Sequence, residues 1–382
     1  MMASLRLPLE IVEEILALLP NESIHRFRSV CKSWSSQLLS EEFQKLRFKS
    51  APPAQKLLHR PQPGLHYGAY LESFDYRGDE ETCTKLIFPV STRFLTIVGS
   101  CNGLVFLAQD SAFDVYRDKL VWNPFTGAYR KLPDPKDKSC HYDWMKRAYG
   151  FGYDSAADDY KVFLGAVHRY PHNPEDRVPK FQIFSMKTGS WKRLKNPDKY
   201  LQHFRESDRG LLSNGALHWG EKDDEKITAF DLSQEKFYDF PAPPEQKFLG
   251  HKGIGIVGEY LCMSWFRTPK VDGSVVWVMK EYLNEKSWVP FIDYRPTLPG
   301  QCSVRYHCNF IADPIQDKED GGCLMFYSHD SDITEVLKWD KNLGKSDRDG
   351  VDEGEVEVKY YQRWAFIPYR EAPTSLEKSQ RF

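Results

Sequence analysis

The segment GIGIVG at residues 253–258 has the G-x-G-x-x-G spacing that could hold a dinucleotide. In that chemistry the glycines follow a strand and open a helix, whose N-terminus binds the pyrophosphate. Here the segment EYLCMSWF follows, with aromatic residues in a β pattern. The glycines are therefore interpreted as part of a hairpin with close strand packing, and no cofactor is expected.

A metal site is the second chemistry that the residue types suggest. Cys302, His307 and Cys308 could bind zinc, with Cys323 as a fourth ligand. Structural zinc sites usually take ligands in closely spaced pairs at both ends of the motif, and that pairing is missing here. The cysteines are interpreted as residues of a β structure, and no metal is predicted.

Carboxylate chemistry is the third possibility. Asp154, Asp158 and Asp159 in YDSAADDYKV could form a paired carboxylate site or a calcium loop. Asp is favoured in hairpin turns because its side chain accepts hydrogen bonds from nearby backbone amides, so a turn is the preferred interpretation. The sequence also has no G-x-S-x-G, H-E-x-x-H or P-loop pattern. The chain is therefore predicted not to be an enzyme.

The overall composition limits the classes of protein further. The 382 residues carry a formal net charge of −2, which gives no general attraction to nucleic acid or anionic lipid. No apolar run approaches the roughly 18 residues of a membrane span. Glu10, Glu13 and Glu14 are unlike a signal peptide, and the eight cysteines contain no C-x-x-C pair. Reduced thiols and a cytoplasmic and/or nuclear location are expected.

Residues 64–370 show an alternating pattern, with strand-like runs between Gly, Pro, Asn and Asp turns. Four segments share one plan, in which an apolar strand, a polar turn and a strand led by an aromatic follow one another. They are VWNPFTGAYRKLP, IFSMKTGSWKRL, AFDLSQEKFYDFP and VMKEYLNEKSWVP, with Tyr129, Trp191, Phe237 and Trp288 as the aromatics. We predict that these four side chains are buried between neighbouring repeats.

A second hairpin precedes each of these segments, and two hairpins per unit are typical of a β-propeller blade. The predicted blades lie at about 94–133, 148–195, 209–241 and 253–291. Weaker strand signals lie at 67–75, 84–90, 322–328, 334–339 and 355–366. The total is expected to be about five to seven blades.

Residues 5–48 instead show helical spacing of apolar residues, including Ile11, Ile15 and Leu19. A Pro-rich stretch follows and is interpreted as a linker. Two interpretations of the helical stripe stay open. It either caps the β region permanently or docks on a partner, as exposed apolar patches commonly do.

The segment LPLEIVEEILALLPNESIHRFRSVCKSWSSQLLSEEFQKLRF resembles an F-box, with its two Leu-Pro pairs and its Val-Cys-Lys-x-Trp run. Ile24 and His25 depart from the leucine-rich pair that is usual there. The phrases SCNGLVFL, WNPFTGAYRKLP, YGFGYDSAADDYKV, FSMKTGSWK and SNGALHWG resemble the F-box-associated domain of plant F-box proteins.

This resemblance implies an α+β chain of two domains, a small helical F-box followed by an all-β, propeller-like (kelch-like) domain. The boundaries are an F-box at 1–48, a linker at 49–66, the β domain at 67–370 and a C-terminal tail at 371–382. The implied function is the substrate-recognition subunit of an SCF-type cullin–RING ubiquitin ligase. A non-degradative scaffold or sequestering module is the alternative, and a propeller enzyme such as a glycosidase is the third.

The implied partners are a Skp-family adaptor, through it a cullin–RING ligase, and a protein target, with no nucleic acid and no membrane. Carried over onto this sequence, the adaptor-binding residues are Leu7, Pro8, Ile11, Val12, Ile15, Leu16, Leu19, Pro20, Ile24, Val30, Cys31 and Trp34.

The target is predicted to bind the face that carries the long connections, above all 134–147 and 168–179. The two hairpin turns of an up-and-down blade lie at one end, so the longer connections gather at the other. Long loops on a rigid scaffold commonly recognise partners, and aromatic and Arg side chains often dominate binding. The candidates are Tyr142, Trp144, Lys146, Arg147, His168, Arg169, Tyr170 and Arg267. The alternative is that these loops vary because nothing constrains them.

Overall fold

A computed structural model describes the helices and strands of the chain. The described residues are 9–19, 21–38, 40, 42–43, 46, 55–60, 70–74, 84–87, 90, 95–109, 118–124, 126–135, 145–168, 180–194, 208–220, 226–243, 252–257, 260–266, 274–294, 308–313, 322–328, 333–339, 356–362 and 364–370.

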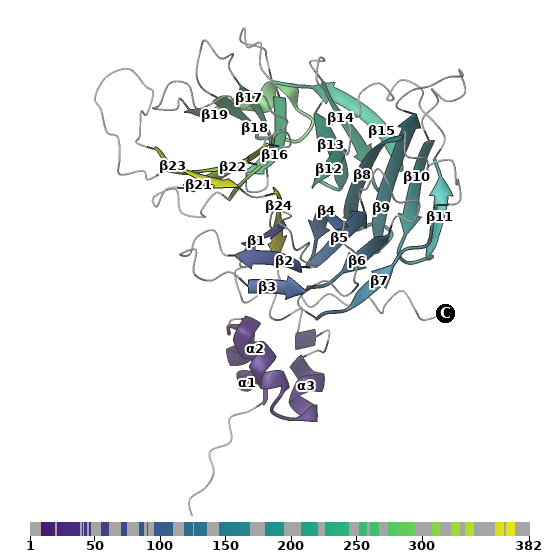
Figure 1. Cartoon of the computed structure of the whole chain (residues 1–382), viewed down its shortest axis with the longest axis vertical. Helices are drawn as coiled ribbons and strands as arrows, with labels where there is room; N and C mark the ends of the chain where they lie inside the picture. Colours follow the sequence, from purple (N-terminus) through teal and green to yellow (C-terminus); the bar gives the residue numbers. More distant parts are fainter. Residues whose placement is uncertain are drawn as a thin grey trace, which may run out of the picture.

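The described elements begin with three short helices. They are α1 (Leu9–Ala17), α2 (Asn21–Arg28) and α3 (Lys32–Leu38). Figure 1 shows the three together (purple), below the sheets in that view. No helix in the described part of the chain has the length and apolar character needed to cross a membrane.

The described strands form six antiparallel units of four strands, and each unit takes the name of the strand at one end of its sheet order. The β24 unit consists of β24 (Trp364–Arg370), β1 (Gln55–Arg60), β2 (Tyr70–Phe74) and β3 (Thr84–Ile87). The β4 unit consists of β4 (Leu95–Cys101), β5 (Leu104–Gln109), β6 (Lys119–Trp122) and β7 (Tyr129–Lys131). The β8 unit consists of β8 (Met145–Asp154), β9 (Asp159–His168), β10 (Lys180–Ser185) and β11 (Ser190–Arg193).

The other three units follow in chain order. The β12 unit consists of β12 (Asp208–Ser213), β13 (Ala216–Gly220), β14 (Lys226–Asp231) and β15 (Lys236–Pro241). The β16 unit consists of β16 (Lys252–Val257), β17 (Tyr260–Phe266), β18 (Ser274–Met279) and β19 (Trp288–Tyr294), with a short 3-10 turn at Glu285–Ser287. The β20 unit consists of β20 (Cys308–Asp313), β21 (Gly322–Ser328), β22 (Ile333–Trp339) and β23 (Val356–Gln362).

The first strands of neighbouring units meet near a common centre. β8 pairs with β12 and β16 with β20, in both cases in parallel, which joins four units into two eight-stranded sheets. In Figure 1, β4, β8, β12, β16 and β24 lie toward the middle, and β7, β11, β15 and β19 lie toward the rim. The helical segment is therefore followed by a β-rich domain of curled sheets, as the change in sequence period predicts.

The apolar core of this domain lies between units rather than within one. On β9, Val162 and Leu164 pack toward the β4 unit, where Phe106 belongs to the same cluster. Phe163 packs the other way, toward the β12 unit, with its ring centroid 5.2 Å from that of Trp219. Successive strand residues point to opposite faces. Both faces of this sheet are covered, so the strand is apolar almost throughout.

Two hairpin turns need residues that tolerate positive φ, and one close approach between two units needs a glycine. Asn102–Gly103 and Asn214–Gly215 both have positive φ, at 49°, 78°, 48° and 74°, as two-residue hairpin turns require. On β8, a Cβ at Gly150 would collide with the side chain of Leu217 in the β12 unit. The glycine thus lets two units approach closely.

The four aromatics proposed as equivalent occupy equivalent places in the ladders. Tyr129 pairs with Trp122, Trp191 with Phe184, Phe237 with Phe230 and Trp288 with Met279. Trp191 and Trp288 are buried, as predicted, and Phe237 is half-buried. Tyr129 is 47% exposed, so the prediction is wrong for that residue.

Two boundary predictions differ from the structure. The stretch 49–66, predicted as a linker, contains β1, which pairs with β2 and β24. Prolines on both sides mask a short strand whose Leu58 is fully buried. The strand signal at 355–366 is divided between β23 and β24, which belong to different units. The local sequence pattern cannot reveal that division, because β24 pairs with β1, which lies about 300 residues earlier in the sequence.

Candidate docking surface of the helical segment

Helix α1 and the turn that follows it carry two neighbouring columns of apolar side chains. Ile11, Ile15 and Leu18 follow one another at spacings of four and three, which places them on one side of the helix. They are exposed by 44%, 49% and 65%. Apolar side chains on this scale normally mark a surface that a partner covers. We name these three residues the outer column.

The second column faces the other helices. Val12, Leu16 and Leu19 contact a small core that also contains Ile24 and Leu38. Beside this core, the rings of Phe27 and Trp34 lie 5.6 Å apart. The Gln37 amide also donates a hydrogen bond to the Glu13 carboxylate, which ties α3 to α1. The helices therefore have a core of their own, and the outer column is not part of it.

The connection between α2 and α3 exposes a second apolar position. Val30 is 63% exposed, and its N–H donates to the carbonyl of Phe27 at 3.1 Å. Cys31 is exposed beside it. Hydrogen bonding to Ser33, at 3.1 Å, and then to the Trp34 backbone lowers the pKa of its thiol. This turn adds apolar and thiol groups to the accessible surface of the helical segment.

Comparison with known families accounts for both regions. The F-box domain matches residues 4–46, and the F-box associated beta propeller domain matches residues 82–346. The second match alone spans more than half of the chain. The protein belongs to the F-box family. Proteins of this family are typically adaptors without catalytic activity of their own.

The relatives of this F-box protein include several from Arabidopsis thaliana. The F-box protein At3g07870 is 30% identical over 317 residues, covering 74% of this chain and 71% of the relative. The F-box/kelch-repeat protein At3g23880 is 28% identical over 315 residues, covering 77% and 80%. Among solved structures, the Malassezia sympodialis allergen Mala s 1 is 11% identical with a TM-score of 0.38, covering 70% of this chain and 77% of that one.

The structure divides the predicted adaptor-binding residues into groups. Ile11, Ile15, Val30 and Cys31 are exposed on the F-box surface, and Val12, Leu19 and Trp34 are partly buried against its core. Leu7, Pro8 and Pro20 lie outside the described residues.

Leu16 and Ile24 are only 8% and 1% exposed and already form the helical core, so their adaptor contact stays a prediction. Leu18, which sequence reasoning missed, is the most exposed member of the outer column. Its place three residues after Ile15 is the signal that could have identified it.

Three of the predicted target-binding residues lie at one end of the β8 unit, and the other five lie outside the residues that the structure describes. Lys146 and Arg147 lie in β8 and His168 ends β9, so these three belong to strands rather than to loops. Met145 pairs with His168, at the end opposite the short turn that joins Asp154 to Asp159. Tyr142, Trp144, Arg169, Tyr170 and Arg267 lie outside the described residues.

The described residues among those that suggested a dinucleotide site or a zinc site lie in strands of the β domain. Gly253 and Gly255 lie in β16, and another strand follows instead of a helix, which excludes the dinucleotide geometry. Cys308 and Cys323 lie at opposite ends of the β20–β21 ladder. Within the described ranges, no three His, Cys, Asp or Glu side chains gather as a metal site would require.

The carboxylate stretch forms a turn, as preferred, because Asp154 accepts from the Ala156 and Ala157 amides at 3.0 and 3.3 Å. Sequence reasoning missed that Asp154 also contacts the β12 unit.

Proposed function

We propose that this F-box protein is the substrate-recognition subunit of an SCF-type cullin–RING ubiquitin ligase. In this proposal the outer column of α1 docks on a Skp-family adaptor, and the β domain holds a protein target. The protein supplies proximity rather than chemistry, because a held target reacts in an effectively intramolecular step. The proposed location is cytoplasmic and/or nuclear.

The single observation that carries the docking half is the outer column itself. The F-box has a closed core without Ile11, Ile15 and Leu18, yet these residues stay exposed. Burying one such side chain contributes about 1.5–3 kcal/mol. Three together could hold a partner firmly, so a matching apolar groove on the adaptor is the expected counterpart.

The target-holding half rests on the architecture of the β domain. We propose that its six described units are the blades of a closed ring, with β24 joining the first blade to the end of the chain. The longer connections would then gather at the end of β8 and β9 where Met145 and His168 pair. The proposed target surface is this face, nearest the connections 134–147 and 168–179.

Adaptor binding tests the proposal through a matched pair of substitutions in the full-length chain. Ile15→Asp should weaken binding of a purified Skp-family adaptor at least about tenfold, because it places a charge where an apolar side chain is buried. Leu283→Asp is the control, since Leu283 in the β16 unit is 50% exposed and Ile15 is 49% exposed. Equal adaptor binding by the two variants would reject the docking surface.

Target transfer separates a ligase from a scaffold. The target is captured from cells with the proteasome blocked, using the intact protein and the Ile15→Asp variant. A ligase receptor should yield a captured protein whose ubiquitination depends on Ile15. A captured protein that is never ubiquitinated would support the sequestering alternative.

A further inference from the structure

Neighbouring units of the β domain meet along seams, and two of these seams are closed by the same hydrogen bond. At the β4/β8 seam the indole N–H of Trp191 donates to the carbonyl of Pro133 at 2.7 Å. At the β12/β16 seam the indole N–H of Trp288 donates to the carbonyl of Pro241 at 3.2 Å. Each acceptor lies four residues after the equivalent aromatic of the preceding unit, Tyr129 or Phe237.

The β8/β12 seam between them cannot use this device. Its equivalent aromatic is Phe237, which has no N–H to donate. The ring packs against Phe163 and Phe181 of the β8 unit, with centroids 5.8 and 5.0 Å apart. The seam therefore has apolar contact at this position but lacks the directional bond found on either side.

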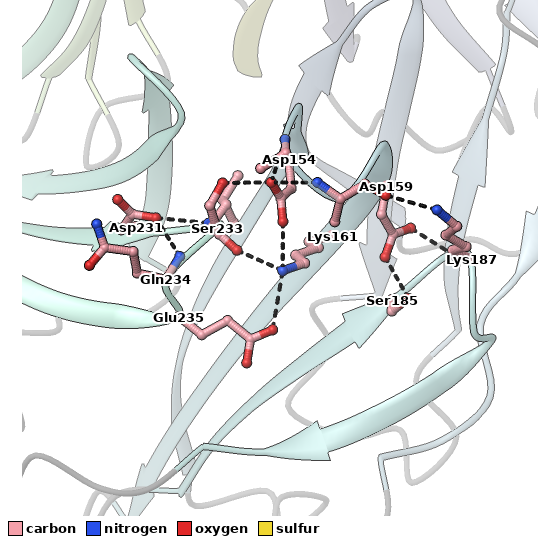
Figure 2. Close-up of polar contacts among 12 residues, drawn as sticks. Asp154, Asp159, Lys161, Ser185, Lys187, Asp231, Ser233, Gln234 and Glu235 are labelled. Atoms are coloured by element: carbon pink, nitrogen blue, oxygen red, sulfur yellow. Dashed lines mark hydrogen bonds and ion pairs between the residues drawn. The ribbon is translucent and has the colours of Figure 1, made fainter.

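A cluster of charges, buried at Lys161 and Asp154, crosses this same seam at its short-turn end. Figure 2 shows the Lys161 ammonium of the β8 unit directed at groups of the β12 unit and at Asp154. It donates to the Leu232 carbonyl at 2.7 Å, lies 2.9 Å from the Asp154 carboxylate and 3.1 Å from that of Glu235. The Ser233 hydroxyl of the β12 unit donates to Asp154 at 2.5 Å.

The members of the cluster satisfy one another. The side chains of Lys161 and Asp154 are only 8% and 2% exposed, and a buried charge is tolerated only when it is paired. Burial raises the pKa of Asp154, but the hydrogen bonds from Ser233 and Lys161 outweigh it and lower the pKa overall. The cluster is thus held in its charged form at neutral pH.

We propose that Asp154, Lys161, Ser233 and Glu235 form a charge latch that closes the β8/β12 seam in place of the indole N–H used at the flanking seams. The residues come from both units, and Ser233 and Glu235 lie in the turn that joins β14 to β15. Removing the ammonium leaves the buried Asp154 carboxylate without its cation and weakens the seam. The Ser233–Asp154 hydrogen bond and the ion pair between Glu235 and Lys192 of the β8 unit remain. This device is independent of what the F-box binds.

Hydrogen exchange of the full-length chain tests the latch. The amides that pair β8 with β12, around Ala148 and Asp208, cross this seam and report its opening. Lys161→Met should speed their exchange at least about tenfold, while exchange in β17 and β18 stays unchanged. Unchanged exchange at β8 and β12, or equal acceleration in β17 and β18, would overturn the proposal.

Two further variants keep the test decisive. Lys187→Met is the control for loss of a lysine charge at the same end, because the exposed Lys187 donates to Ala157 within its own unit, at 2.9 Å. It should leave the seam amides unchanged, and an acceleration equal to that of Lys161→Met would overturn the latch. If Lys161→Met does not fold, Ser233→Ala is measured instead. It should speed exchange a few-fold at this seam alone, and no change there would also overturn the proposal.

Discussion

In the F-box, α1 turns Leu16 inward and leaves Ile15 exposed, whereas in β9 the adjacent residues Val162 and Phe163 are both buried although they point to opposite faces. The difference follows from how each element is covered. A helix at the edge of a helical cluster packs its apolar side against its neighbours, but a sheet between two others is covered on both faces. In the described part of the β domain both faces of β9 are covered, while α1 leaves Ile15 exposed on the surface proposed for the adaptor.

The largest expected effect removes one inter-unit contact in the β domain. Trp191→Ala should lower the free energy of unfolding by about 3–5 kcal/mol, because it empties a buried site. Trp191→Phe keeps most of the packing and loses only the bond to Pro133, at a cost of about 1 kcal/mol. Denaturant unfolding followed by far-ultraviolet circular dichroism measures both values. Equal losses would mean that the hydrogen bond, not the packing, holds this seam.

Substitutions of the adjacent residues Ile15 and Leu16 on α1 compare the outer column with the column that faces the helical core. Leu16→Ala should destabilise the F-box helices by about 2–5 kcal/mol as a core truncation. Ile15→Ala should change their stability by less than about 0.5 kcal/mol and still weaken adaptor binding. Hydrogen exchange of α1–α3 in the full-length chain, measured beside adaptor affinity, separates the two effects. If Ile15→Ala also unfolds the helices, the outer column is part of the core and the comparison fails.

A pH-dependent effect is expected in the β domain. His218 is fully buried, with its ring nitrogens near the Leu211 carbonyl and the Tyr282 hydroxyl, at 3.2 and 2.8 Å. Burial lowers its pKa from 6.5 to about 4. Between these values the unfolded chain binds a proton that the folded chain excludes, so stability is complete above pH 6.5 and falls as the pH drops toward 4.

The loss assigned to His218 is about 3 kcal/mol over that window. His218→Gln cannot titrate, so its unfolding free energy should depend less on pH than that of the parent chain. Denaturant unfolding at pH 7 and pH 4.5 provides the comparison. The same pH dependence in both proteins would show that other groups carry it.

The smallest effect is expected at Tyr129, which is equivalent to Trp191 in the ladders but 47% exposed. Tyr129→Ala should change the unfolding free energy by no more than about 0.5 kcal/mol. A loss close to that of Trp191→Ala would restore the original prediction that all four equivalent aromatics are buried between units.

Much of the fold could be predicted because turn residues and the spacing of apolar residues are local features of the sequence. The Asn-Gly turns at 102–103 and 214–215 and the paired hairpins around Trp191 and Trp288 were readable from residue types alone. The missed features depend on distant partners. β1 is short and flanked by prolines, and its place is set by β24 at the other end of the chain. The candidate site was predicted as one apolar stripe, because periodicity identifies an apolar helix side but not which half of it a neighbour covers.

The sequence by itself determined that a short apolar helical segment precedes a repeating β region, since helical and strand periods differ in the spacing of apolar residues. Only the tertiary structure decided that Leu16 is core and Ile15 is surface, and that Lys161 bridges to Glu235, 74 residues further along the chain. Spacing along a chain specifies which way a side chain points. What lies in that direction depends on how distant elements pack, and burial and charge pairing exist only after that packing.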